Sequence, residues 1–167
     1  MGGSGGHAAR AIAARYKHIH ITVQDLAEVM NQNPMMAGDD HANITFMSHN
    51  FHQPQPLVAD AYFLRFVLHD WPDRICKDII CNLLPAMRTG ARLMVMEVLL
   101  PEPGTQPVWL EKIMYVNDMA MFSLSSGQER TMRQLRAIVE ACEPRLDFEA
   151  ATTPPESHCT LLSWIMR

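Results

Sequence analysis

The stretch FLRFVLHDWPD, residues 63–73, ends an apolar run on two ionisable side chains, His69 and Asp70. A neutral imidazole can accept a proton from a substrate hydroxyl near neutral pH, because the ordinary pKa of histidine is about 6.5. The run predicts a buried strand over residues 60–68, which places His69 at the carboxyl end of a strand, where open α/β sheets bind ligands. His69 is therefore either a general base or a histidine that only bonds the next turn.

Two acids could serve such a base. Glu97 lies within RLMVMEVLL, a predicted strand over residues 92–100. Because a buried, unpaired carboxylate costs several kcal/mol, we expect Glu97 to need a partner, and from an adjacent parallel strand it could hold the tautomer of His69. Glu129, in SSGQERT, is a second candidate, with a solvated loop acid as an equal alternative.

A glycine cluster and an acid form a second constellation. GGSGGH, residues 2–7, precedes a predicted helix over residues 7–16, and Asp25 ends the predicted strand 18–25. Glycines let backbone N–H groups approach a ligand, and a helix N-terminus favours negative charge. An acid about twenty residues further on takes ribose hydroxyls in doubly wound folds. The pair favours a nucleotide site, with a glycine linker as the alternative.

The methionines of a predicted helix over residues 108–124 have two interpretations. Met114, Met119 and Met121 are expected first as core residues. Because methionine adapts to irregular shapes, the same helix could instead form the wall of a pocket for a flat apolar substrate.

Strand-like and helical patterns alternate along the chain, which is typical of a parallel α/β sheet with helices. Asp70 is expected to cap, and Pro72 to begin, a helix that ends before Gly90. The other expected elements are a helix over 26–31, a loop over 33–43, a strand over 44–50, a helix over 131–142 capped by Thr131, and antiparallel strands over 146–152 and 158–166.

Composition narrows the class of protein. A chain of 167 residues with 19% charged residues and a net charge of −4 fits one domain with a small-molecule or protein partner, rather than a disordered segment or a nucleic-acid surface. The four cysteines show no zinc-site spacing, so we expect no metal and no disulfide, and hence a cytoplasmic protein. No apolar stretch approaches the roughly 18 residues of a membrane span.

Taken together, several motifs resemble one family. GGSGGH before a helix, VQDL, the QP turn, ADAYFLRFVLHDWPD, the Glu97 strand followed by LPEPG, and GQERT resemble the plant and fungal small-molecule O-methyltransferases that use S-adenosylmethionine. The resemblance spans nearly the whole chain, and the fungal secondary-metabolite branch is the most similar. It implies a Rossmann-like class I methyltransferase sheet with helices on both faces, and residues 1–167 as one truncated catalytic domain.

The resemblance also implies roles for individual residues. His69 would be the general base, positioned by Glu97 and Glu129, and would act on a hydroxyl of an aromatic or polyketide-type small molecule. The glycine loop would lie against the methionine end of the cofactor, Asp25 would take its ribose, and two further residues would flank adenine. The expected cofactor-binding residues are Gly2, Gly3, Gly5, Asp25, Asn50, Phe51 and Arg65, and the expected substrate-pocket residues are Met114, Asp118 and Met121.

The sequence also departs from the family. It lacks an N-terminal winged-helix dimerisation domain and the first, central strand of the sheet, because Met1 stands where that strand should end. We therefore expect strands 18–25 and 44–50 to have no neighbour joining them to strand 60–68, and an open apolar edge that a homodimer or partner chain could complete. Three functions stay open: a working O-methyltransferase, a methyltransferase-like cyclase or pericyclase, and a degenerate relative.

Overall fold

The computed structural model describes residues 1–32, 43–155 and 157–167. Most of the loop expected over residues 33–43 therefore lies outside the described residues. The described chain divides into two compact units, Met1–Gln53 and Pro54–Arg167. Among the helices described, none is both long and apolar enough to cross a lipid bilayer.

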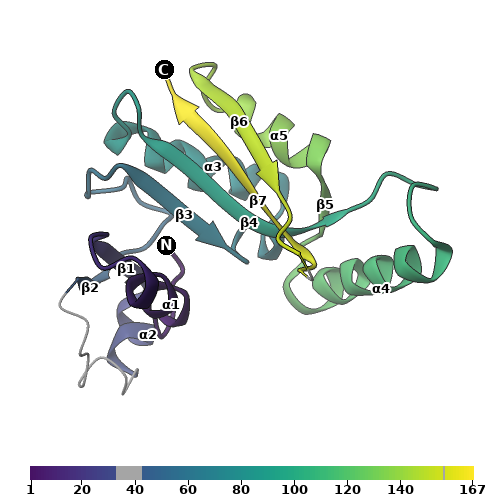
Figure 1. The fold of residues 1–167 in the computed structure, drawn as a ribbon, viewed down its shortest axis with the longest axis horizontal. Helices are drawn as coiled ribbons and strands as arrows, with labels where there is room; N and C mark the ends of the chain where they lie inside the picture. Colours follow the sequence, from purple (N-terminus) through teal and green to yellow (C-terminus); the bar gives the residue numbers. More distant parts are fainter. Residues whose placement is uncertain (33–42, 156) are drawn as a thin grey trace. The chain divides into compact units, whose positions relative to one another are not determined.

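The first unit is a small α/β layer (Figure 1). Its elements are α1 (His7–Arg15), β1 (Ile21–Asp25), α2 (Ala27–Asn31) and β2 (Ile44–Ser48). β1 and β2 form a two-stranded parallel sheet in which Ile21 lies opposite Ile44. Ala9, Val23 and Met30 are its buried core. Each element matches a predicted one, although β1 begins three residues later than the expected strand.

The second unit contains a larger mixed sheet. Its elements, in chain order, are β3 (Ala61–Arg65), a 3₁₀ turn (Leu68–Asp70), α3 (Asp73–Leu83), a second 3₁₀ turn (Leu84–Ala86), β4 (Arg92–Leu100), α4 (Val108–Ser125), β5 (Arg130–Thr131), α5 (Met132–Glu140), β6 (Leu146–Thr152) and β7 (Cys159–Met166). The strand order is β3-β4-β7-β6, with β5 beside the end of β4. β3 and β5 run parallel to β4, whereas β7 is antiparallel to β4 and to β6.

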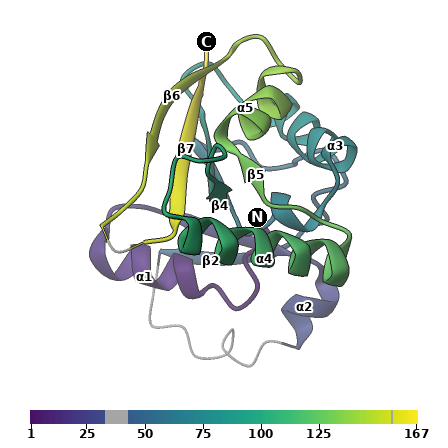
Figure 2. The ribbon, with the colours of Figure 1, turned by 90° about the vertical axis from the view of Figure 1, so that its right-hand side faces the viewer.

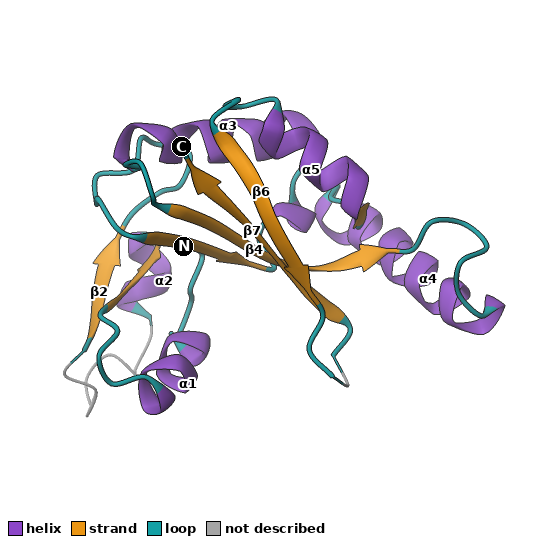
Figure 3. Cartoon of the chain, turned by 45° about the horizontal axis from the view of Figure 1, so that its top comes forward, coloured by secondary structure: helices purple, strands orange, loops and turns teal. Residues whose placement is uncertain are grey.

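Helices α3 and α5 lie on one face of this sheet (Figures 2 and 3). That face carries the core, because alternate residues of the central strands are buried, among them Leu93, Val95, Leu162 and Trp164. α3 contributes its predicted apolar face, including Ile79 and Ile80, while α5 begins with the predicted Thr131 cap, which forms a capping box with Gln134. The packing fixes β4 at the centre of the unit.

The start of α3 differs from the prediction. The expected strand 60–68 ends at Arg65, because Phe66 adopts a left-handed backbone conformation with φ 53° and a 3₁₀ turn follows. Asp70 lies within that turn and does not cap α3, whose N-cap is Pro72 and which has no side-chain cap. The prediction that Asp70 is a helix cap was wrong, since Trp71 and Pro72 separate Asp70 from the first residue of the helix.

The core interpretation of the α4 methionines was also wrong. No residue of α4 is buried, and Met119 is 72% exposed. The apolar residues of α4 are distributed around the helix, so only a half-buried stripe containing Met114, Asp118 and Met121 faces the rest of the unit.

The expected separation of strands is confirmed within the described residues. β1 and β2 pair only with each other, while β3 pairs with β4 in a different sheet. The two described sheets are not joined by hydrogen-bonded strands.

Candidate functional site

Three ionisable side chains converge at the carboxyl ends of β3 and β4. His69 follows β3, Glu97 lies in β4, and Glu129 immediately precedes β5. The Nδ1 atom of His69 lies 3.2 Å from Oε1 of Glu129 and 3.9 Å from Oε2 of Glu97. The side chain of His69 is 15% exposed, against 4% for Glu97 and 5% for Glu129. The structure thus brings together the three residues expected to be catalytic, with their side chains largely buried.

Glu97 holds the backbone that leads to the imidazole. Its Oε1 atom accepts hydrogen bonds from the N–H groups of Val67 at 3.1 Å and Leu68 at 2.9 Å. Its Oε2 atom is buried, and no described residue donates a hydrogen bond to it. The residue-based expectation that Glu97 fixes the tautomer needs correction, because Glu129 makes the hydrogen bond to Nδ1.

The hydrogen bond to Glu129 decides which nitrogen of His69 can act. A carboxylate only accepts hydrogen bonds, so Nδ1 carries the proton and Nε2 presents a lone pair. Burial disfavours the charged imidazole, but the hydrogen bond to Glu129 and the charges of Glu97, Glu129 and Asp70 outweigh it and raise the pKa of His69. Nε2 is therefore the basic atom of the site.

The pKa of Glu97 is displaced as well. Burial raises it from 4.5 to about 7, against the opposing effects of the His69 charge and the two backbone N–H groups. A carboxyl group that accepts through one oxygen and has no donor for the other is suited to carrying a proton on the second oxygen. Near neutral pH the site therefore holds one titrating acid beside the base.

Arg130 connects the turn of His69 to the segment of Glu129. Its guanidinium is buried and donates to the carbonyl of Leu68 at 2.8 Å and that of Trp71 at 2.7 Å. It also donates to Oδ1 of Asp73 through Nε at 2.9 Å and through Nη2 at 2.8 Å. Sequence reasoning missed this residue, although its place directly after Glu129, in the quoted ERT, was a usable signal.

The same segment approaches the turn closely through its backbone. The N–H of Gln128 donates to the carbonyl of His69 at 2.8 Å. A Cβ atom on Gly127 would lie 1.9 Å from that carbonyl oxygen, so only glycine fits. Asp118 of α4, expected in the substrate pocket, accepts a hydrogen bond from the N–H of Glu129 at 2.7 Å. Its observed contact therefore positions Glu129.

Two side chains stack beside the base. The ring of Phe66 lies 5.5 Å from that of His69, with 28° between their planes. The guanidinium of Arg65 lies 4.6 Å above the ring of Phe66. The positive φ of Phe66 is a strained conformation for an aromatic residue, and such strain concentrates at functional sites. Phe66 thus contacts both Arg65 and His69.

A buried thiol lies beneath the turn. Cys76 of α3 is fully buried, and its Sγ donates to the carbonyls of Leu68 at 3.1 Å and Trp71 at 3.3 Å. Burial raises the pKa of Cys76 to about 11. The thiol is therefore unreactive while the turn keeps its place.

In the first unit, the glycine loop and Asp25 meet. The N–H of Ser4 donates to Oδ2 of Asp25 at 2.7 Å, and that of Leu26 donates to Oδ1 at 2.8 Å. The N–H of Gly3 binds the carbonyl of Gln24 at 3.0 Å. Added bulk at Gly3 would lie 2.6 Å from Val23, which requires glycine there.

The other expected cofactor residues of this unit belong to the glycine loop before α1 or follow β2. Gly2 has a positive φ of 61°, and the carbonyl of Gly5 accepts a hydrogen bond from Arg10. Asn50 and Phe51 follow β2, whose last residue lies opposite Asp25, and Asn50 accepts the N–H of His52 at 3.0 Å. All these residues gather at the carboxyl edge of the β1–β2 pair.

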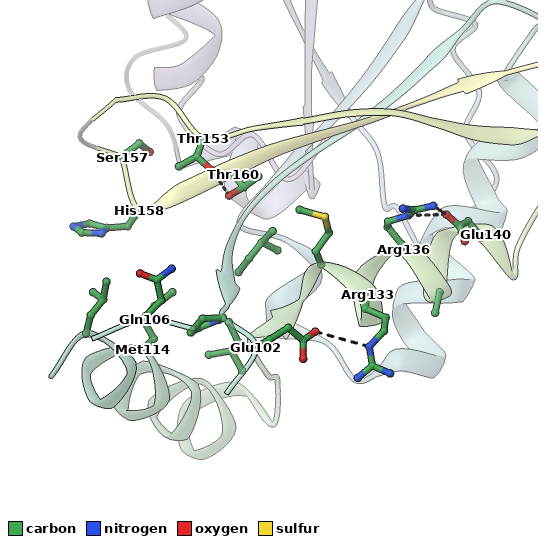
Figure 4. Close-up of a pocket in the computed structure, with 16 residues that line it drawn as sticks. Glu102, Gln106, Met114, Arg133, Arg136, Glu140, Thr153, Ser157, His158 and Thr160 are labelled. Atoms are coloured by element: carbon green, nitrogen blue, oxygen red, sulfur yellow. Dashed lines mark hydrogen bonds and ion pairs between the residues drawn. The ribbon is translucent and has the colours of Figure 1, made fainter. Parts of the chain in front are cut away.

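Figure 4 shows a cavity whose lining does not include the three ionisable residues. It has a volume of about 830 Å³ and is formed by the end of β4, by α4 and α5, and by the loop between β6 and β7. Its charged side chains form ion pairs, Arg133 with Glu102 at 3.8 Å and Arg136 with Glu140 at 2.8 Å. Of the expected site residues that the structure describes, Met114 alone lines it. Its lining includes the imidazole of His158 but none of the three converging residues His69, Glu97 and Glu129.

No group of three or more His, Cys, Asp or Glu side chains within the described ranges could hold a metal ion.

Comparisons with known proteins agree in pointing to one family. The family model for the O-methyltransferase domain matches residues 1–142. The chain is 47% identical over 165 residues to the 6-hydroxytryprostatin B O-methyltransferase of Aspergillus fumigatus, covering 99% of this chain and 48% of that protein. It thus spans about half the length of that relative.

Two solved structures are similar over the whole chain. LepI in complex with SAM has a TM-score of 0.85 at 29% identity, covering 100% of this chain and 42% of the other. A structure described as a pericyclic reaction enzyme gives the same TM-score, identity and coverages, 0.85, 29%, 100% and 42%. The likeness confirms the α/β fold class expected from the sequence.

Proposed function

Because the chain belongs to the O-methyltransferase domain family, we propose that it transfers a methyl group from S-adenosylmethionine to a hydroxyl of an aromatic or polyketide-type small molecule. The match confirms the family inferred from HDWPD and GQERT and, with it, the Rossmann-like class I fold. The relative from Aspergillus fumigatus is named for an O-methyl transfer to a hydroxylated compound, which supports the reaction class.

The observation that carries the proposal is the contact between His69 and Glu129. With Nδ1 donating to Glu129 at 3.2 Å, Nε2 is free to take the proton of a substrate hydroxyl as the oxygen forms its new bond to carbon. Glu129 and Glu97 then stabilise the imidazolium. The cofactor supplies a methyl group already activated on sulfonium, so the protein contributes positioning and a base.

The first unit offers groups that suit the cofactor. Each oxygen of Asp25 accepts one backbone N–H, and an ionised carboxylate has about four acceptor sites, so capacity for ribose hydroxyls remains. The proposed cofactor contacts are those expected from the sequence: Gly2, Gly3, Gly5, Asp25, Asn50, Phe51 and Arg65.

We assign the substrate to the half-buried stripe of α4. Met114 and Met121 offer polarisable surface for an aromatic ring, and Asp118 links that stripe to Glu129. Contact of Met114, Asp118 and Met121 with substrate is a proposal supported by this placement.

Association and location are further parts of the proposal. The exposed apolar residues of α4, such as Val116, Phe122 and Leu124, support a homodimer or a partner chain. All four cysteines are free thiols, which supports a cytoplasmic location.

Calorimetric titration with S-adenosylmethionine, followed by detection of a methylated product, tests this function. Absence of heat at millimolar cofactor would exclude it. If binding is seen, His69→Ala should lower turnover by about 10²-fold or more, whereas Arg74→Gln, on the exposed side of α3, should not. Full turnover in His69→Ala would remove the base from the mechanism.

A methyltransferase-like pericyclase is the second candidate, and the similarity to the structure described as a pericyclic reaction enzyme is consistent with it. Conversion of a polyketide substrate without incorporation of a labelled methyl group would select it. A protein that binds no cofactor and converts no substrate would be a degenerate relative.

A further inference from the structure

We propose that Arg130 is a positioning residue, which clamps the turn carrying His69 to the segment carrying Glu129 and thereby sets the contact between imidazole and carboxylate. Its catalytic consequence rests on the function proposed above, whereas the clamp itself does not.

The contacts of Arg130 enclose His69 in sequence. Leu68 and Trp71, whose carbonyls accept its hydrogen bonds at 2.8 and 2.7 Å, lie on either side of the histidine. The carbonyl of Leu68 also accepts the N–H of Trp71 at 3.2 Å, and both carbonyls accept from Sγ of Cys76, so Arg130 adds the charged donor to each of them. A guanidinium presents five N–H donors in a rigid fork and can bind both carbonyls and a carboxylate at once. Arg130 therefore fixes the turn on both sides of the base.

The backbone of Arg130 is fixed independently. It lies opposite Leu99 in the parallel pairing of β5 with β4, and Glu129 precedes it directly. One residue thus joins three components: the central strand through its backbone, the turn through its side chain, and the acid through the peptide bond. If the turn moved without Arg130, the distance between His69 and Glu129 would change. The side chain of Arg130 therefore keeps that distance fixed.

The burial of the charge argues against a role in stability alone. The side chain of Arg130 is 3% exposed, while that of its carboxylate partner Asp73 is 56% exposed. A half-exposed carboxylate is screened by solvent and compensates a buried cation poorly. The two carbonyls are consequently the contacts that make the buried position tenable, and they belong to the turn of His69.

Titration of His69 by NMR of ¹³C-labelled imidazole tests the clamp without substrate or cofactor. Arg130→Gln should lower the titration midpoint of His69 by about 1 pH unit. Burial of the imidazole lowers its pKa, and the weakened contact with Glu129 would no longer fully oppose that effect. Arg130→Lys keeps the charge but not the fork and should show a smaller fall in the same direction. Arg74→Gln, on a side chain 83% exposed, is the matched control and should leave the midpoint unchanged.

A second variant separates the clamp from the ion pair. Asp73→Asn removes the charge of the partner and leaves both carbonyl contacts available, so its midpoint should stay near that of the parent protein. If Arg130→Lys, folded by circular dichroism, left the midpoint unchanged, or if Asp73→Asn lowered it as much as Arg130→Gln, the proposal would be overturned.

Guanidinium ion provides a rescue experiment. Added at millimolar concentration to Arg130→Ala, guanidinium should reverse part of the fall in the titration midpoint of His69, while an equal concentration of sodium should not. Equal effects of the two ions would count against the clamp. Where methyl transfer is measurable, Arg130→Lys should lower kcat about tenfold with little change in KM. A shifted midpoint in a protein without methyl transfer would retain the clamp and reject the proposed function.

Discussion

His69 is attached to the segment of Glu129 twice, through its imidazole and through its backbone. Nδ1 lies 3.2 Å from Oε1 of Glu129, and the carbonyl of His69 accepts the N–H of Gln128 at 2.8 Å. The two residues are 60 positions apart in the sequence. The orientation of the base is consequently a property of tertiary structure.

The first prediction concerns the pH dependence of methyl transfer. The base acts when neutral, so kcat/KM should rise with pH and level off above the pKa of His69, which lies above 6.5. In Glu129→Gln, loss of the charged partner lowers that pKa, so the acid limb of the profile should move to lower pH while the plateau falls. Rates between pH 5 and 9 provide the measurement. An unmoved limb would mean that Glu129 does not contact the base.

The second prediction concerns stability. The pKa of Glu97 is raised from 4.5 to about 7, so folding favours the neutral acid. The resulting stability is complete below pH 4.5 and is lost as the pH rises through about 7. Between pH 5 and 8 the parent protein should lose about 2 kcal/mol of unfolding free energy more than Glu97→Gln, measured by urea denaturation. Glu102→Gln, on an exposed acid, is the control, and identical pH slopes for Glu97→Gln and the parent protein would contradict the assignment.

The third prediction uses two glycines. Gly127→Ala places a Cβ atom 1.9 Å from the carbonyl of His69, and the turn must move. We expect a loss of about 3 kcal/mol together with a lower pKa of His69. Gly104→Ala, at φ 78° in open space, carries only the backbone cost of about 1 kcal/mol. Thermal denaturation of both variants compares the cost of steric overlap at Gly127 with the cost of backbone strain at Gly104. Equal losses of stability would show that the backbone around Gly127 and His69 can move apart to accommodate a Cβ atom.

The fourth prediction concerns the start of α5. Thr131→Ala removes the acceptor for the N–H of Gln134 and should cost about 1 kcal/mol. Thr131→Ser retains the hydroxyl and should recover most of it, as judged by urea denaturation. A Ser variant as unstable as the Ala variant would assign the effect to the methyl group instead of the cap.

Local patterns predicted the elements whose causes are local. β4 has the predicted bounds because its apolar run is bounded by Gly90 and Pro101, and α5 begins at the predicted cap. Glu97 could be singled out because an acid inside such a strand needs compensation. Its partners, two backbone N–H groups, were not predictable, since they depend on the path of a distant turn.

The turn itself was missed for the same reason. An apolar run predicts a strand as far as Leu68, but the backbone leaves the sheet at Phe66, and Glu97 and Arg130 hold the new path. Arg130 resembles an ordinary charged residue beside a helix until the acceptors of its guanidinium are known. The apolar character of α4 predicts burial, which depends on neighbours that the pattern alone does not specify.

Cys76 makes the mobility of this turn measurable. Because its thiol is buried beneath the carbonyls of Leu68 and Trp71, an alkylating reagent can reach it only after that segment lifts away. The alkylation rate of Cys76, which should be lower than that of the exposed Cys81, therefore reports how often the turn that carries His69 opens.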